Sequence, residues 1–188
     1  RAGFSLPTPG GAVAVGNLNG DAFPDIVVGS ATTSQVFIFY ATGSGTYGTS
    51  STIGVNLGGL SAGIHSLAVA DVDNDGLNDI VALSRGTGVI WVYRQTGPLT
   101  FAIQRGIGAH QDAMALAVGD LTSDGRVDVV TAVHQAPGAI TLHLNLGGGG
   151  VSDLPPSVTV PAYANGEEKG TIVISVAAVD PDGNPIST

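Results

Sequence analysis

Apolar residues along positions 10–145 occur in short runs separated by glycines and polar residues. The runs are rich in valine, isoleucine and alanine, and glycines often bound them. Short runs of this composition predict β-strands, and none has the periodicity of an amphipathic helix. We therefore expect an all-β chain.

The runs recur in a fixed order, which reveals an internal repeat. Each polar loop is preceded by one run, at residues 12–16, 66–70 and 115–119, and followed by a second, at residues 26–29, 80–83 and 129–132. A third run follows at 36–40, 89–93 and 139–143, and a fainter fourth aligns Tyr47 with Phe101 and Ile53 with Ile107. Four strands in a period of about 50 residues are typical of a propeller blade.

The loop at residues 71–79 reads Asp-Val-Asp-Asn-Asp-Gly-Leu-Asn-Asp, with oxygen-bearing side chains at alternate positions. Calcium takes about six to eight oxygens, and the odd positions of this loop supply most of them, while Gly76 allows the turn. The same residue types favour hairpin turns without metal, which is the alternative. Related patterns at residues 17–25 and 120–128 favour the metal.

Acidic residues are concentrated in these three loops. The net charge is −9, and nine of the fifteen acidic residues lie in the loops. So few basic residues argue against nucleic acid or an anionic membrane surface as partner, and no apolar stretch is long enough for membrane insertion. Three bound Ca²⁺ would bring the charge to −9 + 6 = −3.

The chain has no cysteine, so disulfides do not hold the fold. Weak multi-oxygen calcium sites are matched to the millimolar calcium outside cells, so loops in series predict a secreted, extracellular or cell-surface protein. The chain begins with Arg1 rather than Met, which predicts a processed or excised product.

The repeat resembles the FG-GAP/VCBS family, which builds the calcium-bearing β-propellers of integrin α-subunits and of many secreted bacterial proteins. The resemblance covers roughly residues 4–146 and is carried by Asp-x-Asp-x-Asp-Gly-x-x-Asp at 71–79 and Asp-Ile-Val at 79–81. Gly29-Ser30-Ala31 stands where Gly-Ala-Pro is expected, so the bacterial type is the better match. The resemblance implies three four-stranded blades at about 4–60, 61–110 and 111–146.

By this resemblance each metal binds in the hairpin between the first two strands of a blade, through loop positions one, three, five, seven and nine. Position seven ligates through its carbonyl. The implied ligands are Asn17, Asn19, Asp21, Phe23 and Asp25; Asp71, Asp73, Asp75, Leu77 and Asp79; and Asp120, Thr122, Asp124, Arg126 and Asp128. The second loop has the most carboxylates and the first the fewest, so we expect up to three Ca²⁺ with affinity in that order. Ala22 replaces the position-six glycine of the first loop.

Three blades are fewer than the four to eight of known propellers. Phe4-Ser5-Leu6 is typical of an outer strand, whereas the third blade ends at Asn145-Leu146 without one. Closure within the chain, completion of a neighbour's third blade by Phe4–Leu6, and additional flanking blades are the alternatives.

A segment of different character follows. Residues 147–154 are predicted to be a glycine-rich linker, and residues 158–160 and 171–179 to be strands. Residues 180–185 resemble a turn of bacterial immunoglobulin-like and cadherin-like modules, yet residues 155–188 are too few for a whole sandwich. We expect this partial β segment to pack on its own blades or to donate a strand to a neighbour, an incomplete module being the alternative.

Outside the loops the sequence has no paired carboxylates, activated nucleophile or cofactor motif, so we predict a protein that is not an enzyme. The expected role is structural or adhesive, with self-association or binding to other surface proteins, as in a filament or oligomer assembled by strand exchange. The alternative is a carbohydrate- or protein-recognition propeller module of a larger secreted protein. Third-run aromatics such as Phe37, Trp91 and Tyr93 are expected to fill the core rather than to stack on a glycan.

Overall fold

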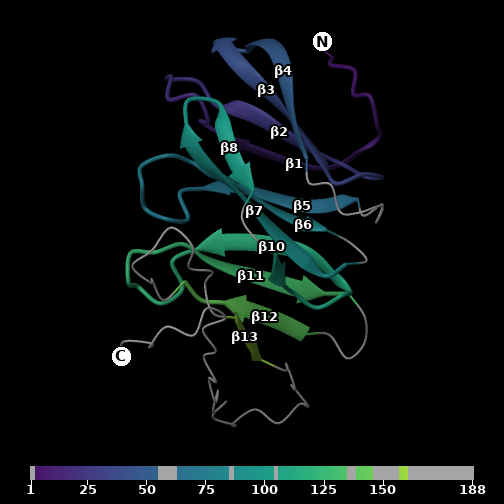
Figure 1. Ribbon diagram of the computed structural model, residues 1–188, viewed down its shortest axis with the longest axis vertical. Helices are drawn as coiled ribbons and strands as arrows, with labels where there is room; N and C mark the ends of the chain where they lie inside the picture. Colours follow the sequence, from purple (N-terminus) through teal and green to yellow (C-terminus); the bar gives the residue numbers. More distant parts are fainter. Residues whose placement is uncertain are drawn as a thin grey trace.

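The computed structural model describes residues 3–54, 63–84, 87–103, 106–134, 139–145 and 157–160. These residues form three antiparallel sheets stacked along the long axis of the molecule (Figure 1). Within the described residues there is no helix that could cross a membrane. The predicted fold class, all-β with propeller-type blades, is confirmed.

Each sheet follows the order of its strands in the chain. Blade 1 consists of β1 (Gly10–Gly16), β2 (Asp25–Ser30), β3 (Gln35–Gly43) and β4 (Thr46–Gly54). Blade 2 consists of β5 (Ile64–Ala70), β6 (Asp79–Ser84), β7 (Val89–Gly97) and β8 (Thr100–Ile103), with β9 (Ile107–Gly108) also paired to β7. Blade 3 consists of β10 (Ala113–Gly119), β11 (Asp128–Val133), β12 (Ala139–His143) and β13 (Ser157–Val160).

The faint fourth strand of the repeat is present where its alignment predicts it. Ile53 lies opposite Val36 in blade 1, and Ile107 lies opposite Ile90 in blade 2. The difference between the blades is that this outer strand is continuous in blade 1 and divided into β8 and β9 in blade 2.

The expectation that the third blade lacks an outer strand is wrong. β13 pairs with β12, with Val158 opposite Leu142 and Val160 opposite Ile140. These residues come from the C-terminal β segment, so that segment adds a strand to the chain's own blade. The predicted linker at 147–154 and strand at 171–179 lie outside the described residues, and the division into domains stays a prediction.

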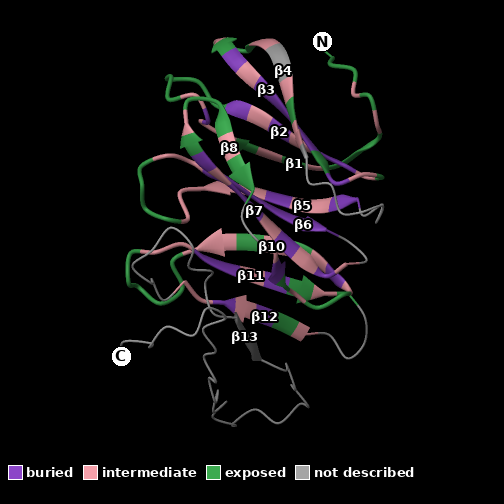
Figure 2. Ribbon diagram, viewed as in Figure 1, coloured by how far each residue is buried: buried purple, intermediate pink, exposed green. Residues whose placement is uncertain are grey.

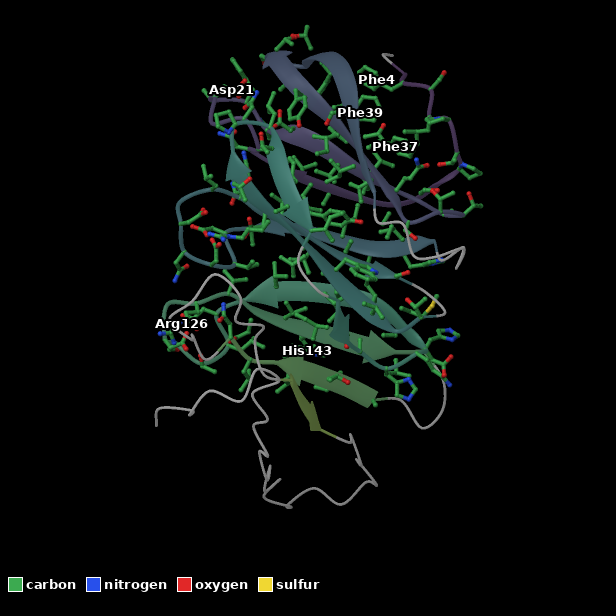
Figure 3. All side chains as sticks on the ribbon, in the orientation of Figure 1. Phe4, Asp21, Phe37, Phe39, Arg126 and His143 are labelled. Atoms are coloured by element: carbon green, nitrogen blue, oxygen red, sulfur yellow. The ribbon has the colours of Figure 1, made fainter. Side chains whose placement is uncertain are left out.

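The expectation of an outer strand at Phe4–Leu6 is also wrong, because residues 3–9 form no strand. The Phe4 ring instead packs over blade 1, with its centroid 5.2 Å from that of Phe39 and 5.6 Å from that of Tyr47. Figure 3 shows Phe4 beside Phe39. The segment therefore forms an apolar cover over part of this blade.

Two apolar cores hold the stack together, because alternate residues of a strand point to opposite faces of a sheet. On β6, Ile80 enters the core shared with blade 1, and Val81 enters the core shared with blade 3. β6 is buried along its whole length, as expected of a strand covered on both faces (Figure 2). This explains why its sequence is a continuous apolar run.

Glycines allow blades 1 and 2 to approach closely. A Cβ atom at Gly16 would lie 2.4 Å from Cγ1 of Val69, and one at Gly29 would lie 2.5 Å from Cγ2 of Ile64. Real Cβ atoms do not come this close to other atoms, so larger residues at these two positions would push the blades apart. The small residues of β1 and β2 thus set the spacing of the stack.

Candidate metal centre

The three acidic loops lie at one edge of the stack, on the left in Figure 3, where Asp21 and Arg126 are labelled. Each loop connects the first and second strands of its blade: β1 to β2, β5 to β6, and β10 to β11. Repeated blades in one orientation bring equivalent hairpins to the same edge, so the three loops are neighbours.

The second and third loops share one backbone conformation, and the first differs. Positions four and six have positive φ in the second and third loops, at Asn74, Gly76, Ser123 and Gly125. In the first loop φ is positive at Gly20, whereas Ala22 is not in the left-handed region. An alanine avoids that region because its Cβ meets the backbone there. The loss of the position-six glycine therefore accompanies a different turn.

The carboxylate at position one closes the second loop. Asp71 accepts hydrogen bonds from the backbone N–H groups of Asp75 at 3.1 Å and Gly76 at 2.8 Å. Asp120 makes the two equivalent bonds in the third loop, at 3.2 and 2.9 Å. Side chains that collect these amides hold the loop in a compact turn around its carboxylates.

The aspartate at position nine is an anchor. Asp79 is fully buried and accepts the backbone N–H of Val72 at 3.0 Å through Oδ2 and that of Gln95 at 2.8 Å through Oδ1. Asp25 and Asp128 make the equivalent pairs of bonds in the other blades. In blades 1 and 2 the anchor joins its loop to the third strand, and in blade 3 it joins its loop to Asn145, just after the third strand. The ligand pattern alone does not reveal this role. Its additional role as a metal ligand stays a prediction.

Amide side chains connect each loop to the following blade. Gln95 of blade 2 donates from Nε2 to the carbonyl of Leu18 at 2.6 Å, and Asn145, after β12, donates from Nδ2 to the carbonyl of Val72 at 2.7 Å. Leu18 and Val72 hold the second position of the first and second loops. The loops are thus fixed both within and between blades.

Within the described residues, one group of three acidic side chains converges as a metal site requires, and it lies in the second loop. Oxygen atoms of Asp71, Asp73 and Asp79 all lie within 4.8 Å of one another. Asp73 is exposed, so this group is open to solvent. Leu77 lies in the same loop, with its N–H 2.9 Å from Oδ1 of Asp75.

Arg94 is a part of this centre that the loop pattern did not predict. Its guanidinium, on β7, pairs with Asp73 through Nε and lies 3.4 Å from Oδ2 of Asp75 through Nη2. Strand register could have indicated this residue. Tyr93 lies opposite Ile80, so Arg94, the residue after Tyr93, lies near the loop. Asp75 is turned toward this cation.

The second loop carries negative charge that its surroundings do not fully compensate. Burial raises the pKa of Asp79 to about 6; its two backbone hydrogen bonds oppose the rise, and the charges of Asp73 and Asp75 add to it. A cation among these oxygens would favour the ionised form. The oxygen-only donor set, the convergence and the excess negative charge fit a hard cation such as Ca²⁺.

The third loop balances more of its own charge. The backbone N–H of Arg126 is the largest cause that holds the pKa of Asp124 below its ordinary value, and the Thr122 side chain and the Arg126 guanidinium contribute. Nη1 of Arg126 lies 3.0 Å from Oδ2 of Asp124. Arg126, predicted to ligate through its carbonyl, thus also places a side-chain cation in the loop. This loop fits Ca²⁺ less well than the second.

The first loop is held together by its own amides. Asn19 donates from Nδ2 to Oδ2 of Asp21 at 2.8 Å, and Nδ2 of Asn17 contacts the Asp21 carbonyl. The N–H of Phe23 donates to Oδ1 of Asp21 at 2.7 Å. With only two carboxylates, Asp21 and Asp25, this loop offers less charge to Ca²⁺ than the other two, and its role as a metal site stays a prediction.

Comparison with known families agrees with the repeat. A family model described as FG-GAP-like repeat matches residues 17–82 and again residues 71–131, which together cover more than half of the chain. No curated protein matches it. Each matched segment contains polar loops and the strands that flank them. The chain therefore belongs to the FG-GAP-like repeat family.

Proposed function

We propose that this protein is a non-catalytic, calcium-binding repeat module with a structural or adhesive role at the cell surface or in the extracellular space. The observation that carries the proposal is the convergence of Asp71, Asp73 and Asp79 in a hairpin of an FG-GAP-like repeat. Repeats of this family are generally structural or recognition elements, occur in extracellular proteins and often bind calcium.

Calcium would act on the second loop through charge. The bound ion supplies two positive charges where Asp71, Asp73 and Asp79 lie close together. Binding to the folded state alone adds to its stability, because the unfolded chain does not hold these carboxylates together. The loop ties β5 to β6, so a stiffer loop makes blade 2 more rigid. The third loop is the proposed weaker site.

Calcium is expected to raise the melting temperature. At about one hundred times its dissociation constant, a ligand that binds one folded-state site adds about 2.7 kcal/mol, or about 5–10 °C for a chain of this size. Differential scanning calorimetry in calcium and in chelator measures the shift, with magnesium as the control for ionic strength. Equal melting temperatures in calcium and chelator would contradict the proposal.

Arg94→Gln is expected to strengthen calcium binding at the second loop by about fivefold, which corresponds to about 1 kcal/mol for a partly exposed ion pair. The reason is that Arg94 competes with the metal for Asp73 and Asp75. Isothermal titration calorimetry measures the tighter site. Arg126→Gln is the matched control, because it removes a cation from the third loop and should leave the tighter site unchanged.

The aromatic residues do not favour the glycan-recognition alternative. Phe37 is 2% exposed and Tyr93 is fully buried, while Trp91 packs against the core between blades 1 and 2. The prediction that third-run aromatics fill the core holds for Trp91 and Tyr93, whereas Phe37 is buried but belongs to neither core between blades. None of the three offers a stacking surface for a sugar. Self-association remains our proposal for the partner, and β13 already fills the outer position of blade 3 without strand exchange.

A further inference from the structure

The face of blade 1 that points away from blade 2 has the composition of a buried surface. Val13 corresponds in the repeat to Leu67 and Leu116, and Val15 corresponds to Val69 and Val118. These four counterparts pack against the core shared with the preceding blade. In blade 1, by contrast, Val13 is 66% exposed and Val15 is 59% exposed. Blade 1 therefore presents the surface with which blades 2 and 3 dock.

The far face of blade 3 presents the opposite surface. Ala12, Ala14 and Gly16 form the side of β1 that meets blade 2. Their counterparts on β10 are Ala115, Ala117 and Gly119, and the two alanines are exposed. A Cβ at Gly16 would strike Val69, whereas a Cβ at Gly119 would have no atom of the described residues within 4 Å. The space that the next blade fills at Gly16 is open at Gly119.

We propose that two copies of this chain join through these faces, with blade 1 of each copy packed against blade 3 of the other. The two end faces are the two halves of a contact that the chain already makes twice within itself. Val15 of one copy would occupy, at Gly119 of the other, the place that Val69 occupies at Gly16. The result is a ring of 3 + 3 = 6 blades, within the range of known propellers. Twofold symmetry leaves no end face open.

The N-terminal segment covers part of this face of blade 1 and leaves its inner strand exposed. Phe4 covers blade 1 near Phe39 and Tyr47, on the outer strands β3 and β4. Val13 and Val15 lie on β1, the inner strand, and stay exposed. Neighbouring blades within the chain meet through the inner strands β1, β5 and β10. Docking within the chain also uses Trp91 and Tyr93 of β7. Their counterparts Phe37 and Phe39 are buried in blade 1, so closure of the ring requires the segment at Phe4 to move aside.

The contact between copies is expected to be weaker than the contacts within a chain. The internal contacts include the amide bonds from Gln95 to Leu18 and from Asn145 to Val72. Ala41 holds the equivalent position in blade 1 and has no amide to donate. We therefore infer a dimer that forms reversibly with protein concentration.

Sedimentation equilibrium of the full chain tests the proposal. The mass is expected to rise with concentration from 18.6 kDa to about 37 kDa, which is 2 × 18.6 kDa, and to rise no further. Val15→Glu places a charge in one half of the contact, and Gly119→Val fills the open space in the other half. Each variant is expected to stay monomeric. Ile103→Glu is the control, because Ile103 is 47% exposed on the outer strand β8, and it should dimerise like the parent chain.

Mixing the two variants separates this arrangement from others. Val15→Glu retains an intact blade 3 face and Gly119→Val retains an intact blade 1 face, so an equimolar mixture is expected to recover a 1:1 pair of about 37 kDa, twice 18.6 kDa. A dimer made by two blade 1 faces would be insensitive to Gly119→Val. Val13→Glu gives the same test if Val15→Glu fails to fold, which the melting temperature of the dilute variant reveals.

Three results would overturn the inference: a monomer at every concentration, a dimer that only one of the two variants disrupts, or growth beyond two copies. The inference deepens the structural role proposed above and rests on it. The proposed function and the inferred dimer can nevertheless fail separately, because calorimetry measures calcium binding and the solution mass measures assembly. A calcium-binding monomer would leave the proposed function standing and remove the ring.

Discussion

Asp25→Asn is expected to destabilise the protein by about 2 kcal/mol in calcium-free buffer at neutral pH. Asp25 is buried and accepts two backbone amides, from Leu18 and Ala41. An asparagine has nearly the same shape but replaces one acceptor oxygen with a donor, so one buried N–H loses its partner at a cost of about 1–3 kcal/mol. For a chain of this size the melting temperature should fall by about 4–8 °C.

Two further variants show whether the loss of stability comes from the anchoring hydrogen bonds or from metal binding. Asp21→Asn removes an exposed carboxylate from the same loop and is expected to cost much less without calcium. Asp79→Asn removes the equivalent anchor from the second loop and is expected to cost less than Asp25→Asn, because it also removes a charge that burial disfavours, as the raised pKa of Asp79 indicates. Chemical denaturation in chelator gives all three free energies of unfolding. Equal costs for Asp21→Asn and Asp25→Asn would contradict the anchor role.

His143→Phe is expected to remove a loss of stability that the parent chain suffers in acid. Burial lowers the pKa of His143 from 6.5 to about 4, and within the described residues neither ring nitrogen has a hydrogen-bond partner. Below pH 6.5 the unfolded chain binds a proton that the folded chain does not bind until about pH 4. Stability from this residue is therefore complete above pH 6.5 and falls toward pH 4, by about 3 kcal/mol in all.

The comparison of variant with parent isolates this effect. Asp79 acts in the opposite direction, because its raised pKa means that the folded chain binds a proton first, and stability rises as pH falls from about 6 toward 3.8. Denaturation of both proteins at a series of pH values should give curves that diverge below pH 6.5. Phenylalanine suits the site because Phe39 holds the equivalent position in blade 1. His134→Gln, at an exposed position, should follow the parent.

The strands were predictable because each repeat marks them in the same way, with glycines at their ends and a fixed distance to the polar loop. The position of β13 was not. Its sequence, Ser-Val-Thr-Val, suits the edge of any sheet, and the intervening residues 144–156 do not specify a partner. The pairing of β13 with β12 depends on tertiary contacts, which the local sequence does not determine. The same holds for Phe4, whose contacts with Phe39 and Tyr47 depend on the folded blade.

The loops of the candidate site were predictable from the sequence, but the different roles of the residues within each loop were not. A ligand pattern counts side-chain oxygens and does not show which backbone amides they meet. One signal was available: positions five and nine are aspartate in all three loops, including the first, where amides replace the other carboxylates. Position five accepts the N–H of position seven in every loop. Position nine accepts a backbone N–H in or just after the third strand. Arg94 lies on a separate strand, β7, so the sequence of the loop alone does not predict its contribution.

Two of the amide bonds between blades, from Gln95 and from Asn145, share a direction that matters while the chain is being made. In both cases the donor belongs to the later blade, and the acceptor is the second residue of the earlier loop. A ribosome therefore releases the first loop well before Gln95 emerges, and the second well before Asn145 does. The bond from the later blade therefore forms after those within the earlier loop, and a chain stopped early ends in a blade whose loop is held only by the bonds within that blade.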